Sequence, residues 1–241
     1  SRRSALHVAV ECGYDAAAKK LIVAGADVDL INPDVGVGPL HIAARGGHKQ
    51  LVVYLLIGGA SPDARDMYER TPLCVSAKFS HENVVSELLV SNGTDKDAVD
   101  IDGLTPLMFA CGGGHLSTAR TLLAAGADTA IRGTSGYSAL DAAAFAGHVS
   151  IVTALLEHGV DVNATDGCDY TALHQAANRN QVAAVEMLID AGIPVDVMTT
   201  DTGMTPLTIA AARGGVESTL ALLRRGAKVD EAGNRQRTPL H

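Results

Sequence analysis

The chain has 241 residues, of which 47% are apolar and 19% charged, so it carries enough apolar material for a core and is not expected to be disordered. Its formal net charge of −8 argues against non-specific binding to nucleic acid, because phosphates attract a basic face. No stretch approaches the length of uninterrupted apolar sequence that a membrane-spanning helix needs.

The four cysteines stand far apart, and no Cys-x-x-Cys pair is present. This spacing predicts neither a disulfide scaffold nor a zinc site, and it favours a reducing compartment, the cytoplasm or the nucleus. The chain begins at Ser1 without an initiator Met or a secretory apolar stretch, and we expect it to be cut from a longer protein.

A short pattern, Thr or Ser followed by x-Leu, returns along the chain every 33 or 34 residues, with Gly in place of Thr in the second copy. The copies start at Ser4, Gly38, Thr71, Thr105, Ser138, Thr171, Thr205 and Thr238. In the seven complete copies an Ala-rich stretch follows, then a Gly-His or close variant, a hydrophobic run that ends in a Leu pair in five of them, and Gly-Ala-Asp or a relative; the eighth copy stops at His241. Thr suits a helix N-cap, Pro after it suits the first turn, and Gly after the Leu pair suits a C-cap. Each copy is therefore predicted to form two short antiparallel helices followed by an extended turn segment.

These residues resemble the ankyrin repeat, whose signature is Thr-Pro-Leu-His, Ala-Ala, Gly-His, Leu-Leu and Gly-Ala-Asp in that order. The resemblance implies an all-α repeat solenoid of paired antiparallel helices with β-turn or hairpin loops, stacked into a curved right-handed array with a concave face. Residues 1–241 are expected to be a single domain, with repeats near 1–32, 33–65, 66–99, 100–132, 133–165, 166–199, 200–232 and a partial one at 233–241. The signature Leu should be buried in each complete copy: Leu6, Leu40, Leu73, Leu107, Leu140, Leu173 and Leu207.

No arrangement of residues predicts catalysis, so we expect no enzyme, no metal and no cofactor. Eight of the nine His fall on signature positions, where the resemblance implies local hydrogen bonds that hold the turns. The segment Gly133-Thr134-Ser135-Gly136 does not have the form of a nucleophile elbow. The acidic run at residues 97–102 has the wrong spacing for a calcium loop.

The resemblance implies that a partner meets the concave side, formed by the turn tips and the exposed ends of the first helices. At these positions aromatic residues gather, and Arg and Lys outnumber Asp and Glu. Exposed aromatic and Arg side chains are typical of interface hot spots. The expected partner-binding residues are Met67, Tyr68, Arg70, Lys78, Phe79, Leu104, Tyr137, Phe145, Tyr170, Asn178, Arg179, Met204 and Arg213.

The sequence therefore predicts a non-catalytic protein–protein interaction scaffold, a monomer that binds a protein or peptide. The basic residues at the binding positions favour an acidic or phosphorylated partner. One alternative is that Tyr and Arg at the tips only pack on neighbouring tips, with the Arg stem covering apolar surface. A second is that the segment recruits substrates to, or inhibits, an enzyme elsewhere in a larger polypeptide. A third, nucleic-acid binding through the basic groove, is disfavoured by the acidic remainder of the chain.

Overall fold

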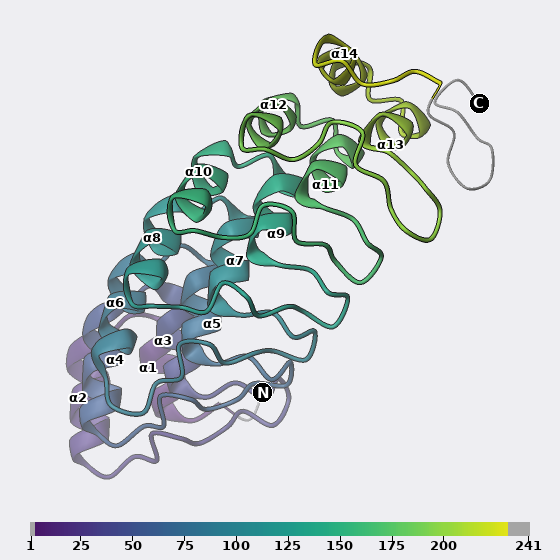
Figure 1. Ribbon diagram of the computed structural model, residues 1–241. Coiled ribbons are helices and arrows are strands. Elements are labelled where there is room, and N and C mark those ends of the chain that lie inside the picture. The colour runs from purple at the N-terminus through teal and green to yellow at the C-terminus, as the bar shows by residue number, and fades with distance from the viewer. Residues whose placement is uncertain (1–2, 231–241) are drawn as a thin grey trace. The chain divides into compact units, whose positions relative to one another are not determined.

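The computed structural model describes residues 3–230, and the partial eighth repeat at 233–241 lies outside them. The described part is all-helical, with short helices that follow one another in pairs (Figure 1). The first helices of the pairs are α1 (Ala5–Glu11), α3 (Pro39–Gly46), α5 (Pro72–Lys78), α7 (Pro106–Gly113), α9 (Ala139–Ala146), α11 (Ala172–Asn178) and α13 (Pro206–Ala212). The second helices are α2 (Asp15–Val23), α4 (Lys49–Ile57), α6 (Glu82–Val90), α8 (Leu116–Ala124), α10 (Val149–Glu157), α12 (Val182–Asp190) and α14 (Val216–Arg224).

The chain divides into two compact units, one of Ser1–Ala110 with Ser117–Asp128 and one of Cys111–Leu116 with Thr129–His241. In the first unit α1, α3 and α5 pack side by side in one layer and α2, α4 and α6 in a second. In the second unit α9, α11 and α13 form one layer, and α10, α12 and α14 form the other. Each unit is thus a stack of helix pairs, as the repeats predict.

Side-chain caps begin the first helices where the sequence places them. The hydroxyls of Ser4, Thr71 and Thr205 accept hydrogen bonds from the backbone N–H three residues later, as do those of Thr105 and Ser138. Pro in the first turn of α3, α5 and α13 has no N–H to leave unpaired. The second helices end before glycines with positive φ, such as Gly25 and Gly59, as a C-cap requires.

The core is aliphatic and lies between the two helix layers of each unit. The seven signature Leu residues are all buried, which confirms that prediction: Leu6, Leu40, Leu73, Leu107, Leu140, Leu173 and Leu207. Alanines of the first helices, such as Ala43 and Ala77, are fully buried beside them and let the layers approach closely. Since each such Leu fills a tightly packed space, its truncation to Ala costs about 2–5 kcal/mol.

Carboxylates tie several neighbouring turn segments together. The Asp29 carboxylate accepts the Ser61 backbone N–H at 3.0 Å, and Asp63 does the same for Asp95 at 2.9 Å. The turns contain only isolated β-bridges in the described residues, Asn32 with Val37 and Thr165 with Thr171. These bonds fix the turn tips relative to one another within each unit.

The signature histidines hold turns in two ways. His7 and His174 bond the cap residue three positions earlier, at 2.7 Å to Ser4 Oγ and 3.0 Å to Thr171 Oγ1, as expected. The Nε2 atoms of His41 and His81 instead bond carbonyls in a neighbouring repeat, 2.9 Å from the Arg70 oxygen in the first case. His174 does both, because its Nε2 also lies 3.1 Å from the Met204 carbonyl oxygen in the next repeat. The signature histidines therefore hold their own turns and link neighbouring repeats.

Candidate protein-binding surface

A buried or half-buried carboxylate shapes the turn tips of the third, fourth and sixth repeats, from which several predicted site residues project. In the third repeat Asp66 Oδ1 accepts the backbone N–H groups of Tyr68 and Arg70, and the Arg70 guanidinium returns to Asp66 Oδ2 at 2.7 and 2.8 Å. Burial opposes ionisation of Asp66, but the bonds from Arg70 outweigh it and hold the pKa of this carboxyl below its ordinary value. Asp100 and Asp166 make the same pair of backbone bonds in their own repeats. The tips are therefore preorganised.

In the first unit a hollow of about 530 Å³ opens between the ends of first helices and the turn tips. We call it the Phe79 hollow; its lining includes Glu11, His41, Arg45, His48, Asp66, Arg70 and Phe79. The Arg45 guanidinium lies over the Phe79 ring, 5.6 Å from its centre. No carboxylate of the described residues forms an ion pair with Arg45. The face of its guanidinium contacts the Phe79 ring, and the N–H groups at its edge can donate hydrogen bonds to a partner.

In the second unit a smaller hollow of about 230 Å³ occupies the corresponding place. We call it the Tyr170 hollow; it is lined by Tyr170, His174, Asn178, Met204, Ile209, Ala212 and Arg213. Arg213 Nε donates to Asn178 Oδ1 at 2.8 Å, which holds the guanidinium at the rim. Burial lowers the pKa of His174 to about 4, so this ring is neutral and serves to position Tyr170, whose ring centre is 5.5 Å away.

Beside the Tyr170 hollow, an aromatic cluster joins two neighbouring repeats. Tyr137 meets Phe145 edge to face at 6.4 Å, and the Arg179 guanidinium lies 4.2 Å from the Phe145 ring centre. The Tyr137 hydroxyl donates to the Asp141 carbonyl at 3.1 Å, and burial raises the pKa of Tyr137 above its ordinary value. The Arg179 guanidinium therefore lies on a ring of the preceding repeat, at the ends of the first helices and not at the turn tips.

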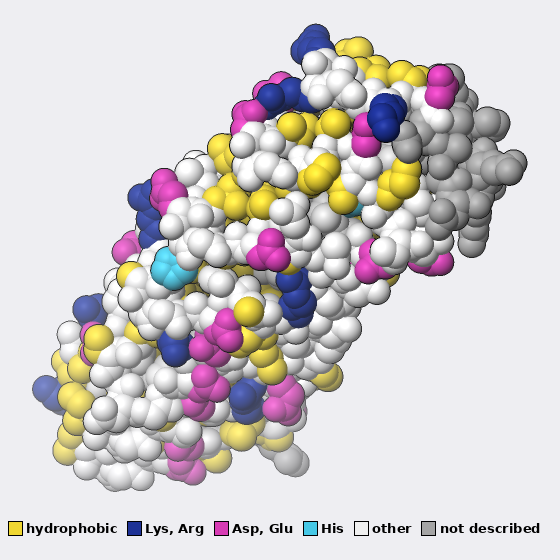
Figure 2. All heavy atoms as spheres, in the orientation of Figure 1, with side chains coloured by type: hydrophobic (Ala, Val, Ile, Leu, Met, Phe, Trp, Pro, Cys, Tyr) yellow, Lys and Arg dark blue, Asp and Glu magenta, His cyan; other side chains and the backbone are white. Residues whose placement is uncertain are grey.

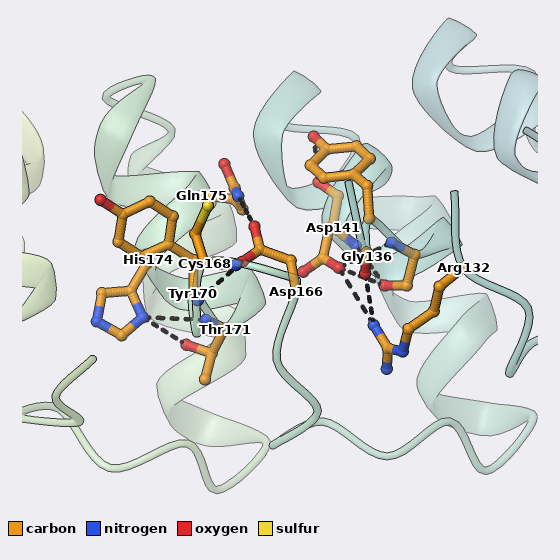
Figure 3. A network of polar contacts seen from close by, with 11 residues as sticks. Arg132, Gly136, Asp141, Asp166, Cys168, Tyr170, Thr171, His174 and Gln175 are labelled. Atoms are coloured by element: carbon orange, nitrogen blue, oxygen red, sulfur yellow. Dashed lines mark hydrogen bonds and ion pairs between the residues drawn. The ribbon is translucent and has the colours of Figure 1, made fainter. Parts of the chain in front are cut away.

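A network of polar contacts lies at the starts of α9 and α11 and on the turn tips before them (Figure 3). Asp141 accepts both the backbone N–H and the hydroxyl of Ser138, and the Arg132 guanidinium lies 3.8 Å away. Burial raises the pKa of Asp141 to about 6, and the bonds from Ser138 oppose this rise. Figure 3 shows Asp166 on the neighbouring tip, where it accepts the Gln175 amide at 2.8 Å and the Tyr170 backbone N–H at 3.0 Å. The network fixes backbone at both tips.

Backbone strain gathers at these same places. Four non-glycine residues of the described chain have positive φ: Glu69, Ser80, Asp169 and Asn180. Each is next to a predicted site residue, and the matching positions in other repeats are mostly glycine. A side chain in this conformation costs about 1 kcal/mol or more, and such strain is concentrated at functional sites in proteins.

The structure brings some of the predicted site residues into the hollows and leaves others beside them. Arg70 and Phe79 line the first hollow, and Tyr170, Asn178, Met204 and Arg213 line the second. Met67 and Tyr68 are exposed on a tip, with Arg70 4.6 Å from the Tyr68 ring centre. Lys78 lies over the Phe109 ring at 5.5 Å, and Leu104 is half-buried. Binding by any of these residues stays a prediction.

Some surface residues were not among the predicted set. Arg45, Glu11 and His48 line the Phe79 hollow, and Ile101 and Val35 are exposed apolar side chains on turn tips. Arg45, Glu11, Ile101 and Val35 all occupy the repeat positions that the resemblance assigns to the binding side. Their repeat positions therefore marked these four residues as candidates, although the predicted set did not include them.

The cysteines of the described residues differ in their exposure. Burial raises the pKa of the Cys111 thiol to about 12 and also raises that of Cys74, so neither thiol forms a thiolate near neutral pH. Cys12 and Cys168 are exposed, and all four cysteines are free. Within residues 3–230, His, Cys, Asp and Glu form no group of three or more that could hold a metal ion. No helix in this part of the chain is long and apolar enough to cross a bilayer.

The comparisons with known proteins agree with the repeat geometry. The family model described as ankyrin repeats (3 copies) matches residues 6–100, 87–166 and 165–233. An ankyrin repeat and KH domain-containing protein of Caenorhabditis briggsae is 34% identical over 130 residues, covering 53% of this chain and 5% of the relative. The B-cell lymphoma 3 protein homolog of Mus musculus is 31% identical over 134 residues, covering 54% of this chain and 30% of the relative.

The solved structure of the ankyrin repeat domain of Bcl-3, titled a unique member of the IkappaB protein family, superimposes with a TM-score of 0.78 at 30% identity. The match covers 93% of this chain and 99% of that one. The chain spans less than a third of the length of the curated relatives named above. Matches to the repeat model along nearly its whole length show that this chain belongs to the ankyrin repeat family and is a protein-interaction module.

Proposed function

We propose that this chain is a non-catalytic scaffold or adaptor that binds a protein or peptide on the side formed by the turn tips and the ends of the first helices. The observation that carries the proposal is the presence in each unit of a hollow that combines an aromatic ring with an arginine. The pairs are Phe79 with Arg45 in the first unit and Tyr170 with Arg213 in the second. Aromatic and Arg side chains in a concave setting supply most of the binding energy in protein interfaces.

The preorganisation of these side chains supports the proposal. Arg213 is held by a hydrogen bond to Asn178, and Arg45 lies against the Phe79 ring. A partner therefore does not need to immobilise freely rotating side chains. Each side chain that is already ordered removes part of the entropic cost of association. The positive-φ residues next to Phe79 and Tyr170 also fit a surface maintained for binding at a cost in stability.

Two arginines, Arg45 in the Phe79 hollow and Arg179 beside the Tyr170 hollow, favour an acidic or phosphorylated partner. Arg45 and Arg179 lie on aromatic faces and have no carboxylate partner among the described residues. A guanidinium edge binds carboxylate or phosphate oxygens in a bidentate manner. Attraction of this kind raises the association rate and weakens as salt is added.

A second candidate function rests on the lengths of the relatives. The chain covers 14% of a putative palmitoyltransferase ZDHHC13 of Danio rerio and 17% of an E3 ubiquitin-protein ligase XBAT33 of Arabidopsis thaliana. In this second proposal the repeats recruit substrates to, or inhibit, a catalytic part of the same polypeptide. Enzyme assays of a longer form of the protein with and without residues 1–241 distinguish it from a free-standing adaptor.

The test begins with a partner captured by the intact chain and then measures its affinity for single variants. Phe79→Ala and Tyr170→Ala should each weaken binding by about tenfold or more, because each removes the aromatic floor of one hollow. Tyr54→Ala is the matched control: Tyr54 is a half-buried aromatic residue on α4, under Lys19 and outside both hollows. Unchanged binding in a folded Phe79→Ala, Tyr170→Ala double variant would rule out the proposed surface.

The charge claim has a separate test. Arg45→Glu should slow association with the partner and flatten its dependence on salt, while Arg45→Lys should keep much of the salt dependence but lose the bidentate contact. Association rates that are the same for all three proteins at low salt would contradict an acidic partner and leave the apolar part of the proposal standing.

A further inference from the structure

Three second helices of the first unit end in large apolar side chains that face solvent. Val23, Ile57 and Val90 are the last residues of α2, α4 and α6, and they are 81%, 80% and 77% exposed. They occupy the same position in their repeats, nineteen residues after the cap position. We call them the helix-end stripe. The four later repeats carry small or charged residues at this position: Ala124, Glu157, Asp190 and Arg224.

The stripe residues are exposed and lie on neighbouring helices. Because α2 packs on α4 and α4 on α6, the three side chains follow one another across neighbouring helices. The residues that come next are small, and Gly25 and Gly59 have nothing within 4 Å of the place where a Cβ would be. The core does not need these three exposed β-branched residues, because other residues of the same helices, such as Ala18, Leu55 and Leu88, are fully buried. Aligned apolar surface of this kind marks an interaction site.

The spacing of the stripe selects the form of its partner. Packed helices lie about 8–10 Å apart, so consecutive stripe residues are separated by about that distance. In a partner helix, residues seven positions apart lie on one face and about 10.5 Å apart along the axis. In an extended strand, residues three positions apart reach about 10 Å but point to opposite faces, so a strand cannot place three side chains on the stripe.

The charges beside the stripe set the polarity of the partner. An acidic rim, the carboxylates of Asp27, Asp29, Asp63 and Asp95, follows the stripe within six residues in each repeat. Figure 2 shows acidic side chains following one another over the turn segments of the first unit. On the second helices Lys19 lies over the Tyr54 ring and Lys49 pairs with Glu87 at 3.4 Å, so these two cations are already engaged. A basic flank on the partner would therefore be attracted to the rim.

We propose that the helix-end stripe binds an amphipathic helix of a partner protein, with large apolar residues every seventh position and Lys or Arg along the flank that meets the acidic rim. The docked helix lies across α2, α4 and α6. This surface is separate from the two hollows, which are built from the first helices and turn tips. One array can therefore hold a helix on its second-helix layer while another segment occupies the hollows.

The test uses a synthetic Ala-rich helical peptide with Leu at every seventh position and Lys on one flank, labelled for fluorescence anisotropy. A control peptide of the same composition has Leu at every fifth position, which turns the Leu side chains to different faces. The protein variants are Ile57→Glu and its matched control Ala124→Glu, which adds the same charge at the same repeat position. Ile57→Glu should fold, because Ile57 is exposed and Glu157 occupies this position in the fifth repeat.

The proposal expects the heptad-spaced peptide to bind the intact chain and to bind Ile57→Glu about tenfold or more weakly, with Ala124→Glu close to the intact chain. Exchanging Lys for Glu on the peptide flank should also weaken binding, and more so at low salt. Failure of the heptad peptide to bind, equal binding of the control peptide, or equal loss in both protein variants would each overturn the proposal. Phe79→Ala should leave peptide binding unchanged, which separates this surface from the hollows.

Discussion

Gly38→Ser should stabilise the first unit, because Gly38 is the one cap of a first helix that lacks a hydroxyl in the described chain. Its backbone, at φ −91° and ψ 169°, matches that of Ser4 at −76° and 165°. A Cβ on Gly38 would have no atom nearer than 4.0 Å, and one of the two at that distance is His41 Nδ1. The substitution therefore brings a hydroxyl to a place that accommodates it without strain.

The new hydroxyl could donate a hydrogen bond to His41 Nδ1. His41 Nε2 lies 2.9 Å from the Arg70 carbonyl, which can only accept, so Nε2 carries the proton and Nδ1 is an acceptor. That Nδ1 is buried without a hydrogen-bond partner, whereas the equivalent atoms of His7 and His174 bond the cap hydroxyl. Pairing a buried acceptor gains about 1 kcal/mol, and replacing Gly by a residue with fewer unfolded conformations adds about 0.5 kcal/mol.

Urea denaturation of the intact chain, Gly38→Ser and Gly38→Ala measures the effect. Gly38→Ser should raise the free energy of unfolding by about 1–2 kcal/mol. Gly38→Ala gains the same chain entropy but supplies no hydroxyl, so it should lie clearly below Gly38→Ser. Equal stability of the two variants would refute the reasoning about His41 Nδ1.

Three further predictions concern stability, each measured by denaturation. Glu69→Gly should stabilise by about 1 kcal/mol because it relieves a positive φ, while Gly103→Ala at the same repeat position should destabilise; effects of the same sign would contradict this. Burial raises the pKa of Asp141 to about 6, so the protonated form of this residue favours the folded state. Its contribution to the free energy of unfolding is complete below about pH 4 and is lost as the pH rises through about 6. The intact chain should therefore lose about 2–3 kcal/mol relative to Asp141→Asn across that range, and parallel pH profiles would disprove it. Leu122→Ala should cost about 2–5 kcal/mol and Val90→Ala less than about 0.5 kcal/mol, since the first side chain is fully buried and the second exposed; similar costs would mean that the repeat register is wrong.

The sequence was sufficient to predict the repeat phases, the capped starts of the first helices and the burial of the signature Leu residues. These features depend on local chemistry that recurs at fixed spacing, such as the Thr71 hydroxyl three residues before the Cys74 N–H. Most positions with positive φ carry glycine and could be predicted in the same way. Glu69 and Asp169 adopt this conformation without being glycine, and their residue types do not predict it. Local rules therefore account for the helix pairs.

The contacts between repeats could not be predicted in the same way. Arg45 lies over a ring of the following repeat, Phe79, whereas Arg179 lies over a ring of the preceding one, Phe145. The choice between the following and the preceding repeat depends on the side-chain rotamers and on the space beside each ring. The spacing of residues in the sequence determines neither. Ile57 illustrates the same limit. It directly follows a Leu pair, so its sequence context suggests a buried residue, yet its side chain is exposed in the structure.

The most direct test of the account places a photo-crosslinking amino acid at single positions and asks where a captured partner becomes attached. Positions 79 and 170 lie in the two hollows, and position 150 is an exposed control on α10, in the second-helix layer of the second unit. The account predicts covalent partner adducts from positions 79 and 170 and none from position 150. Adducts from position 150 with none from either hollow would contradict it.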